Sequence, residues 1–239
     1  MKINNVVFGG WHMKVLVTGG SRGLGKSIVK MFVERGHEVF FTYYKTNINI
    51  EGAKGMYCDI SKESDVENLF QNIEELDVII NNAGISIDNA LEDKTALEFR
   101  QVLDTNLVGV FNVLKYGSKK IKKGSIINIS STNGIDTGYV LSMDYDASKA
   151  GVISLTHNMA KYLAPDIRVN CVAPGWINTD MNKYLFPDFK REEENKILLK
   201  RFATCEEVAE VVYFLASDKA SYINDTVIRV DGGYNGIGR

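Results

Sequence analysis

The sequence predicts an α/β protein built on a doubly wound parallel sheet with helices on both faces. Short apolar runs rich in β-branched residues recur along the chain, and helical stretches lie between most of them. A glycine-rich turn within TGGSRGLGKSI, residues 18–28, follows the first run. Apolar strands that alternate with helices are typical of a parallel sheet covered on both faces.

The elements can be placed in order from these patterns. The first strand is expected at Lys14–Thr18, and the next helix, in which Ile28 and Phe32 lie four residues apart, ends at Gly36. The segment Thr46–Ala53 is too short and polar for a crossover helix, so we expect a loop there. The other strands are expected at Glu38–Tyr44, Gly55–Cys58, Asp77–Asn81, Ser125–Ser130, Ile167–Val172 and Thr226–Val230. Further helices are expected at Ser64–Ile73, Leu97–Tyr116, Ala147–Leu163 and from the capping box Thr204-x-x-Glu207 through Ala216.

The chain reads as one domain, because its 239 residues contain no linker, repeat or break in composition. Residues 13–239 are expected to form this domain. Met13 directly precedes the first strand, so residues 1–12 are interpreted as an optional extension. Their apolar runs are interrupted by polar residues, which indicates neither a signal peptide nor a membrane span.

Composition excludes several classes of function. The formal net charge is −2, which gives no reason to expect nucleic acid or a membrane surface as a partner. The three cysteines are odd in number and lie in apolar or helical patterns, which favours reduced thiols in a cytoplasmic protein. The histidines, His12, His37 and His157, lack ligand spacing, so no metal site is expected.

Two phosphate-binding patterns overlap in the glycine-rich turn. Gly20-x-x-x-x-Gly25-Lys26-Ser27 satisfies the P-loop template of nucleotide hydrolases and kinases, for which Asp231 is the best candidate magnesium partner. The glycines at 19, 23 and 25 are instead spaced like a dinucleotide-binding turn. Both patterns place phosphate at a helix N-terminus, so the turn alone does not decide between them.

Residues that follow the strands favour a dinucleotide. The second strand is followed by Tyr44 and Lys45 rather than by an acid that would bind the ribose of NAD. Arg22 and Lys45 could neutralise a 2′-phosphate, which favours NADP. Asp59 follows the third strand in a position to accept a hydrogen bond from adenine, and Asn82-Ala83-Gly84 follows the fourth. The turn Pro174–Thr179 follows the sixth strand and could bind a carboxamide.

A tyrosine and a lysine follow the fifth strand at helical spacing. Tyr145 and Lys149 share a helix face, so the ammonium would stabilise phenolate and lower the tyrosine pKa towards use as an acid–base catalyst. A serine at Ser130-Ser131 could polarise a carbonyl. The spacing alone is weak evidence, because Tyr116 and Lys120 show it too.

Taken together, these motifs resemble the short-chain dehydrogenase/reductase family from about Lys14 to the C-terminus. The resemblance depends on the following ordered set: TGGSRGLG, Cys58-Asp59, NNAG at Asn81–Gly84, Thr105-Asn106, ISS at Ile129–Ser131, Tyr145-x-x-x-Lys149 and PGWINTDM at Pro174–Met181. It implies a single-domain Rossmann-like fold.

The resemblance also implies residue roles. Ser131 would bind and polarise the substrate carbonyl, Tyr145 would be the general acid/base, and Asn106 would hold a water in a proton relay. Lys149 would lower the pKa of Tyr145 and bind the nicotinamide ribose. The cofactor-binding set would be Gly19, Gly20, Ser21, Arg22, Gly23, Leu24, Gly25, Tyr44, Lys45, Asp59, Ile60, Asn82, Ala83, Gly84, Tyr145, Lys149, Pro174, Gly175, Ile177 and Thr179.

Within this family, residues 201–233 and the PGWINTDM turn look most like bacterial 3-oxoacyl-acyl-carrier-protein reductases, which use NADPH and are usually tetramers. That likeness implies fatty acid biosynthesis, a cytoplasmic homo-oligomer and an acyl carrier protein as possible partner. Two departures are present. The gap from Ser131 to Tyr145 is one residue longer than usual, which leaves the choice between Ser130 and Ser131 open. LAPDI at 163–167 lacks the arginine with which such reductases meet the acidic carrier, which leaves the substrate open. A group of four lysines is a candidate substitute: Lys119, Lys120, Lys122 and Lys123.

Other functions remain open from the sequence alone. The substrate could be another ketone or secondary alcohol, derived from a sugar or a secondary metabolite, with NAD as a possible cofactor. A P-loop phosphotransferase and a non-catalytic NADP sensor are alternatives from other classes. The segment Asn182–Arg201 mixes aromatic and charged residues, and we expect it to form a mobile lid over the substrate pocket.

Overall fold

The computed structural model describes residues 12–179 and 185–235, and its seven strands form one parallel sheet. The strand order is β3-β2-β1-β4-β5-β6-β7, so the order reverses between β1 and β4. The strands are β1 Lys14–Val17, β2 Glu38–Tyr43, β3 Ala53–Tyr57, β4 Val78–Asn81, β5 Gly124–Ile129, β6 Ile167–Pro174 and β7 Val227–Val230. The prediction of a doubly wound parallel sheet is confirmed.

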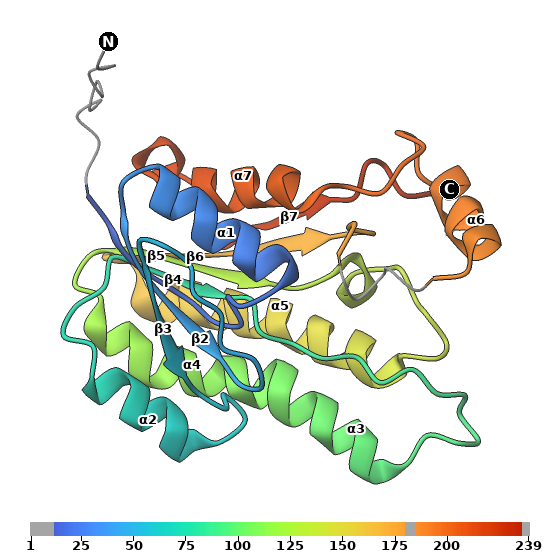
Figure 1. Cartoon of the computed structure of the whole chain (residues 1–239), viewed down its shortest axis with the longest axis horizontal. Coiled ribbons are helices and arrows are strands. Elements are labelled where there is room, and N and C mark those ends of the chain that lie inside the picture. The colour runs from blue at the N-terminus through green and yellow to red at the C-terminus, as the bar shows by residue number, and fades with distance from the viewer. Residues whose placement is uncertain (1–11, 180–184, 236–239) are drawn as a thin grey trace.

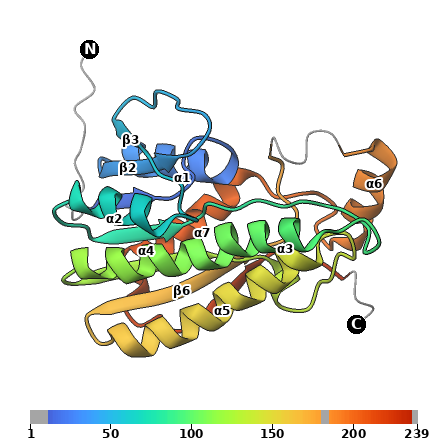
Figure 2. The ribbon, with the colours of Figure 1, turned by 90° about the horizontal axis from the view of Figure 1, so that it is seen from below.

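Helices cover both faces of this sheet. Helices α1 and α7 lie on one face, and α2, α4 and α5 lie on the other, as Figures 1 and 2 show from two directions. Their bounds are α1 Gly23–Glu34, α2 Glu63–Gln71, α3 Ala96–Leu103, α4 Gly109–Gly117, α5 Met143–Leu163, α6 Pro187–Lys196 and α7 Cys205–Ala216.

Alternation along the strands divides the core into two layers. On β1, Val15 and Val17 pack with α1 and α7, whereas Leu16 between them packs with the helices of the opposite face. On β4, Ile80 packs on the face of α1 and α7, and Ile79 packs on the opposite face. Successive side chains of a strand point to opposite faces, so continuous apolar runs are what a sheet buried on both sides requires.

The expected helix Leu97–Tyr116 contains an irregular turn. The chain is helical from α3 to α4, but Asp104–Val108 is a π-helical turn between them. A capping box begins α3, where the Thr95 hydroxyl accepts from the Glu98 amide and the Glu98 side chain accepts from the Thr95 amide. The predicted capping box at Thr204 and Glu207 is confirmed at the start of α7.

Other expectations hold with small shifts. The link from Tyr44 to Gly52 contains no helix, as expected. Helix α5 starts at Met143, four residues before the predicted start at Ala147, so Tyr145 and Lys149 both lie on it. The proposed extension 1–12 lies outside the described residues apart from His12. No helix in the described part of the chain is long and apolar enough to cross a bilayer.

Candidate active site

A cavity of about 1500 Å³ lies at the carboxyl ends of the strands, where the strand order reverses. Ligands of open α/β sheets bind at such a switch point. Among the expected site residues, Gly20 and Asn106 do not line it. The other expected site residues do: Gly19, Ser21, Arg22, Gly23, Leu24, Gly25, Tyr44, Lys45, Asp59, Ile60, Asn82, Ala83, Gly84, Ser131, Tyr145, Lys149, Pro174, Gly175, Ile177 and Thr179.

The glycine-rich turn is built for close approach of backbone to ligand. Gly19 has a φ of +65°, and a Cβ there would lie 2.9 Å from the Cα of Ala83. A Cβ at Gly25 would lie 2.3 Å from the carbonyl oxygen of Gly19 and 2.4 Å from Nδ2 of Asn82. The turn ends at the N-terminus of α1, whose free amides favour an anion. Gly20, in contrast, packs against Phe41 and Val29 in the core.

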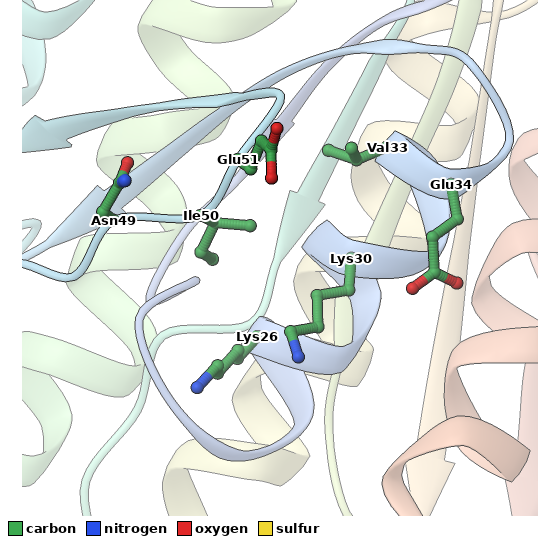
Figure 3. Close-up of a pocket in the computed structure, with 7 residues that line it drawn as sticks. All are labelled: Lys26, Lys30, Val33, Glu34, Asn49, Ile50 and Glu51. Carbon is green, nitrogen blue, oxygen red and sulfur yellow. The ribbon is translucent and has the colours of Figure 1, made fainter.

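The geometry does not support the P-loop alternative. Lys26 does not line the large cavity but a separate hollow of about 310 Å³ on the outer side of α1, where Figure 3 shows it beside Lys30. The Ser27 hydroxyl donates to the Glu206 carboxylate at 3.1 Å. Asp231, the candidate magnesium partner, accepts hydrogen bonds from Arg229.

The end of the cavity near β2 and β3 carries the cations and the acid that the sequence singled out. Arg22 and Lys45 are exposed and line the cavity with Tyr44. The Asp59 carboxylate accepts hydrogen bonds from the Ser61 amide and hydroxyl, which fix its orientation. No acid stands from Tyr43 to Thr46 at this edge.

The two adjacent serines after β5 have different surroundings. The Ser130 hydroxyl is buried and donates to the backbone carbonyl of Lys149 at 2.8 Å. The Ser131 side chain lines the cavity with Tyr145, and its hydroxyl accepts from the Asn133 amide at 3.2 Å. The hydroxyl of Ser130 is thus engaged by the backbone of α5, which favours Ser131, and the role of Ser131 stays a prediction.

Burial dominates the acid–base properties of the tyrosine–lysine pair. It raises the pKa of Tyr145 to about 12, although the hydrogen bond with Ser131 acts in the opposite direction. It lowers the pKa of Lys149 to about 8. The Lys149 Nζ donates to the carbonyl of Ile129 at 2.8 Å and lies 5.4 Å from the centre of the Tyr145 ring. The predicted lowering of the Tyr145 pKa by Lys149 stays a prediction.

Asn106 lies in the π-helical turn and is fully buried. Its side-chain amide donates to the backbone carbonyl of Ile85 and accepts from the Ile85 amide, each at 2.8 Å. It also donates to the Ser148 hydroxyl at 3.1 Å. The side chain thus fixes the chain after β4 against α5, and a part in a proton relay stays a prediction.

Three aromatic side chains form one wall of the cavity, and two of them lie in segments that the sequence singled out, the turn Pro174–Thr179 and the segment Asn182–Arg201. Tyr139, Trp176 and Phe189 line it, and their rings are in contact with one another through Phe189. The last of these belongs to α6, which lies beyond the carboxyl edge of the sheet in both ribbon views. The spacing of Phe189, Glu193 and Lys196, at i, i+4 and i+7, would have indicated one helix face turned towards the site.

The lysine group proposed to meet a carrier protein is not beside this cavity within the chain. Lys119, Lys120, Lys122 and Lys123 lie between α4 and the start of β5, at the amino edge of the sheet. Lys122 pairs there with Glu75, which precedes β4. The predicted lid segment Asn182–Arg201 is described only from residue 185 onwards, and α6 forms much of that part.

The sequence predicted no metal site, because its histidines lack ligand spacing. Within residues 12–179 and 185–235, no group of three or more His, Cys, Asp or Glu side chains is arranged to hold a metal ion.

Comparison with known proteins agrees with this geometry. Residues 19–235 match the family model described as enoyl-(acyl carrier protein) reductase. The chain is 38% identical to the 3-oxoacyl-[acyl-carrier-protein] reductase FabG of Aquifex aeolicus, over 91% of this chain and 95% of that protein. It is also 38% identical to the 3-oxoacyl-[acyl-carrier-protein] reductase MabA of Mycobacterium bovis, over 92% and 91%.

Solved structures give the same result. A short chain dehydrogenase family protein from Francisella tularensis superimposes with a TM-score of 0.86 at 32% identity, covering 94% of this chain and 99% of that one. The aldohexose dehydrogenase of Thermoplasma acidophilum does so with a TM-score of 0.85 at 30% identity, covering 93% and 94%. By sequence, fold and site, this chain belongs to the short-chain dehydrogenase/reductase family and is an oxidoreductase most like the bacterial 3-oxoacyl-acyl-carrier-protein reductases.

Proposed function

We propose that the protein reduces a ketone with NADPH, and that the ketone is a 3-oxoacyl thioester converted to the 3-hydroxyacyl form. The observation that carries this proposal is that Ser131, Tyr145 and Lys149 line one cavity, with the Lys149 Nζ 5.4 Å from the centre of the tyrosine ring. Hydroxyl donors in such a cavity suit a carbonyl oxygen that gains negative charge.

The cavity fits a dinucleotide in residue type and shape. The cradle that a Cβ at Gly19 or Gly25 would fill can accept a pyrophosphate, and Arg22 and Lys45 can accept a 2′-phosphate. Thr179 lies across the cavity close to Gly23, since a Cβ at Gly23 would lie 3.7 Å from its side chain. NADPH, when bound, supplies the hydride.

The protein's own residues supply orientation and the proton. The Ser131 hydroxyl donates to the substrate carbonyl and holds it beside Tyr145. With a pKa near 12, Tyr145 keeps its proton at neutral pH and gives it to the carbonyl oxygen. The Lys149 ammonium stabilises the phenolate that this transfer leaves behind.

The relatives' names support this choice of substrate, and one experiment tests it. The curated relatives are named for reduction of a 3-oxoacyl group, whereas the family model is named for an enoyl group. The two activities can be separated by measuring NADPH oxidation with a 3-oxoacyl thioester and with the enoyl thioester of equal length. We expect turnover of the ketone alone. Turnover of the enoyl compound alone, or of ATP, would contradict the proposal.

One observation favours a second candidate substrate, a hydroxylated ketone. The cavity beyond Tyr145 is lined by Asp88 and Glu192 as well as aromatic rings, a mixture that suits a polar substrate. The structural relative from Thermoplasma is named an aldohexose dehydrogenase. The preferred substrate can be identified by comparing kcat/KM for a panel of sugars and thioesters, each measured with NADPH and with NADH.

Partners and location are part of the proposal. We propose an acyl carrier protein as the source of substrate, and equal kcat/KM for carrier-bound and small soluble thioesters would argue against it. Val108 and Phe111 are 41% and 47% exposed on and beside α4, which supports a homo-oligomer that covers them, expected as a dimer or tetramer in light scattering. The reduced thiols of Cys58, Cys171 and Cys205 suit the reducing cytoplasm.

A further inference from the structure

Glu193 is a buried carboxylate that the proposed chemistry does not use. It lies on α6, is only 6% exposed and lines the cavity. Its Oε2 accepts hydrogen bonds from the indole N–H of Trp176 at 2.9 Å and from the hydroxyl of Tyr234 at 2.8 Å. Its Oε1 accepts from Lys196. A carboxylate at this depth is costly unless it is fully hydrogen-bonded, and here it is.

The three donors come from different parts of the chain. Trp176 lies in the turn after β6, Tyr234 in the C-terminal segment, and Lys196 at the end of α6 itself. The backbone continues this connection, because the Asn235 amide donates to the Lys196 carbonyl at 2.8 Å. Glu193 is therefore the point at which α6, the turn after β6 and the C-terminal segment are joined.

The same residues support the aromatic wall of the cavity. The Trp176 ring stacks on Phe202 with centroids 5.3 Å apart and meets the edge of Phe189 at 5.9 Å. Phe189 precedes Glu193 by one helical turn on α6, and its ring reaches Tyr139 in the loop before α5. The orientation of Trp176 thus depends on stacking against neighbours and on a single polar bond, the one to Glu193.

We propose that Glu193 is a positioning residue, which holds Trp176 and α6 as the wall against which the ketone substrate is placed. This inference rests on the proposed function for its kinetic consequence. It assigns Glu193 no contact with the reacting atoms: Glu193 acts on substrate binding through Trp176. The cofactor cradle at Gly19 and Gly25 belongs to other elements and is expected to be unaffected.

Fluorescence tests the proposal independently of activity. The chain has two tryptophans, so in a Trp11→Phe background Trp176 is the sole emitter. In that background, Glu193→Ala is expected to raise quenching of Trp176 by acrylamide. Glu193→Gln keeps an oxygen that can accept from Trp176 and Tyr234, and is expected to restore protection. Glu194→Ala on the same helix is the matched control, since Glu194 is partly exposed and pairs with Lys190. Equal quenching in Glu193→Ala and its parent would overturn the proposal.

Kinetics test the consequence for substrate. We expect Glu193→Ala to raise KM for the ketone by about tenfold, because a displaced pocket wall weakens substrate placement. The Kd for NADPH should not change, and Glu193→Gln and Glu194→Ala should keep the parent KM. An unchanged KM, or a loss of NADPH affinity of equal size, would contradict the positioning role. If no ketone is turned over by the parent, the proposed function fails, while the fluorescence result still decides whether Glu193 holds Trp176.

Discussion

Lys94 and Asp144 form an ion pair whose side chains are buried, and Asp144 directly precedes Tyr145 in the sequence. The Lys94 Nζ lies 2.9 Å from Asp144 Oδ2, with side chains 3% and 0% exposed, and it also donates to the carbonyl of Ile87. The other carboxylate oxygen of Asp144 accepts from the Tyr145 amide at 2.9 Å. This pair fastens the segment after β4 to the first turn of the helix that carries the tyrosine.

Removing the lysine should therefore destabilise the protein. Lys94→Met leaves an uncompensated buried carboxylate, and we expect the free energy of unfolding to fall by about 3–5 kcal/mol. Urea denaturation at neutral pH measures this change. Lys122→Met is the control, because Lys122 is 88% exposed where it meets Glu75 and should change stability by less than about 1 kcal/mol. Equal effects of the two variants would contradict this view of the pair.

Cofactor preference should depend on Arg22 and Lys45. Each charge-assisted contact with a 2′-phosphate is worth about 1.5–3 kcal/mol. Arg22→Gln and Lys45→Gln should therefore each weaken the affinity for NADPH by at least about tenfold, while the affinity for NADH changes little. Calorimetric titration with both cofactors measures this. Lys26→Met, on the separate hollow of Figure 3, should bind NADPH like the parent. Unchanged preference in the Arg22 and Lys45 variants would show that the phosphate lies elsewhere.

The pH dependence should show an alkaline limb from Lys149. With its pKa lowered to about 8, Lys149 is charged below this pH and neutral above it, whereas Tyr145 keeps its proton up to about pH 12. Because phenolate formation needs the cation, kcat/KM for reduction should fall about tenfold per pH unit above about pH 8. Steady-state rates measure this decrease, and circular dichroism at each pH shows whether the protein is still folded. A rate that stays constant to about pH 10 would exclude the role given to Lys149.

The two neighbouring serines should respond differently to removal of the hydroxyl. Ser131→Ala removes the donor beside Tyr145 and should lower kcat/KM by about 10²–10³. Ser130→Ala removes the bond to the Lys149 carbonyl and should cost about 1 kcal/mol of stability while keeping most of the activity. Comparing kcat/KM and urea midpoints of both variants tests the assignment, and the opposite ranking of activities would reverse it.

The sequence was most informative where local rules decide the structure. Continuous apolar runs such as Asp77–Asn81 gave the strands, because a strand buried on both faces has no polar alternation. The capping box at Thr204 located the start of α7. The side-by-side placement of Ser131, Tyr145 and Lys149 followed from the family resemblance, since the Tyr116–Lys120 spacing showed that the pattern alone was not specific.

Contacts between residues far apart in the sequence could not be predicted from it. The first turn of α5, which starts earlier than predicted at Met143, contains Asp144, whose partner Lys94 lies 50 residues away in sequence. Hydrophobic periodicity does not report the π-helical turn that holds Asn106, because the flanking helices keep their apolar faces. The position of the lysine group at 119–123 could have been foreseen, since residues between a helix and the next parallel strand lie at the amino edge of the sheet, opposite the site.

The central claim is that Tyr145 delivers the proton in a reduction whose cofactor sits on the glycine turn. Its most direct test is kcat/KM for the 3-oxoacyl thioester in Tyr145→Phe, with the Kd for NADPH measured on the same sample. Tyr116→Phe is the matched control, because Tyr116 shares the spacing to a lysine but its hydroxyl donates to Glu63 outside the cavity. We expect Tyr145→Phe to lose about 10²–10⁴ in kcat/KM with a far smaller change in the Kd for NADPH, and Tyr116→Phe to match the parent. Full activity in Tyr145→Phe would contradict the account.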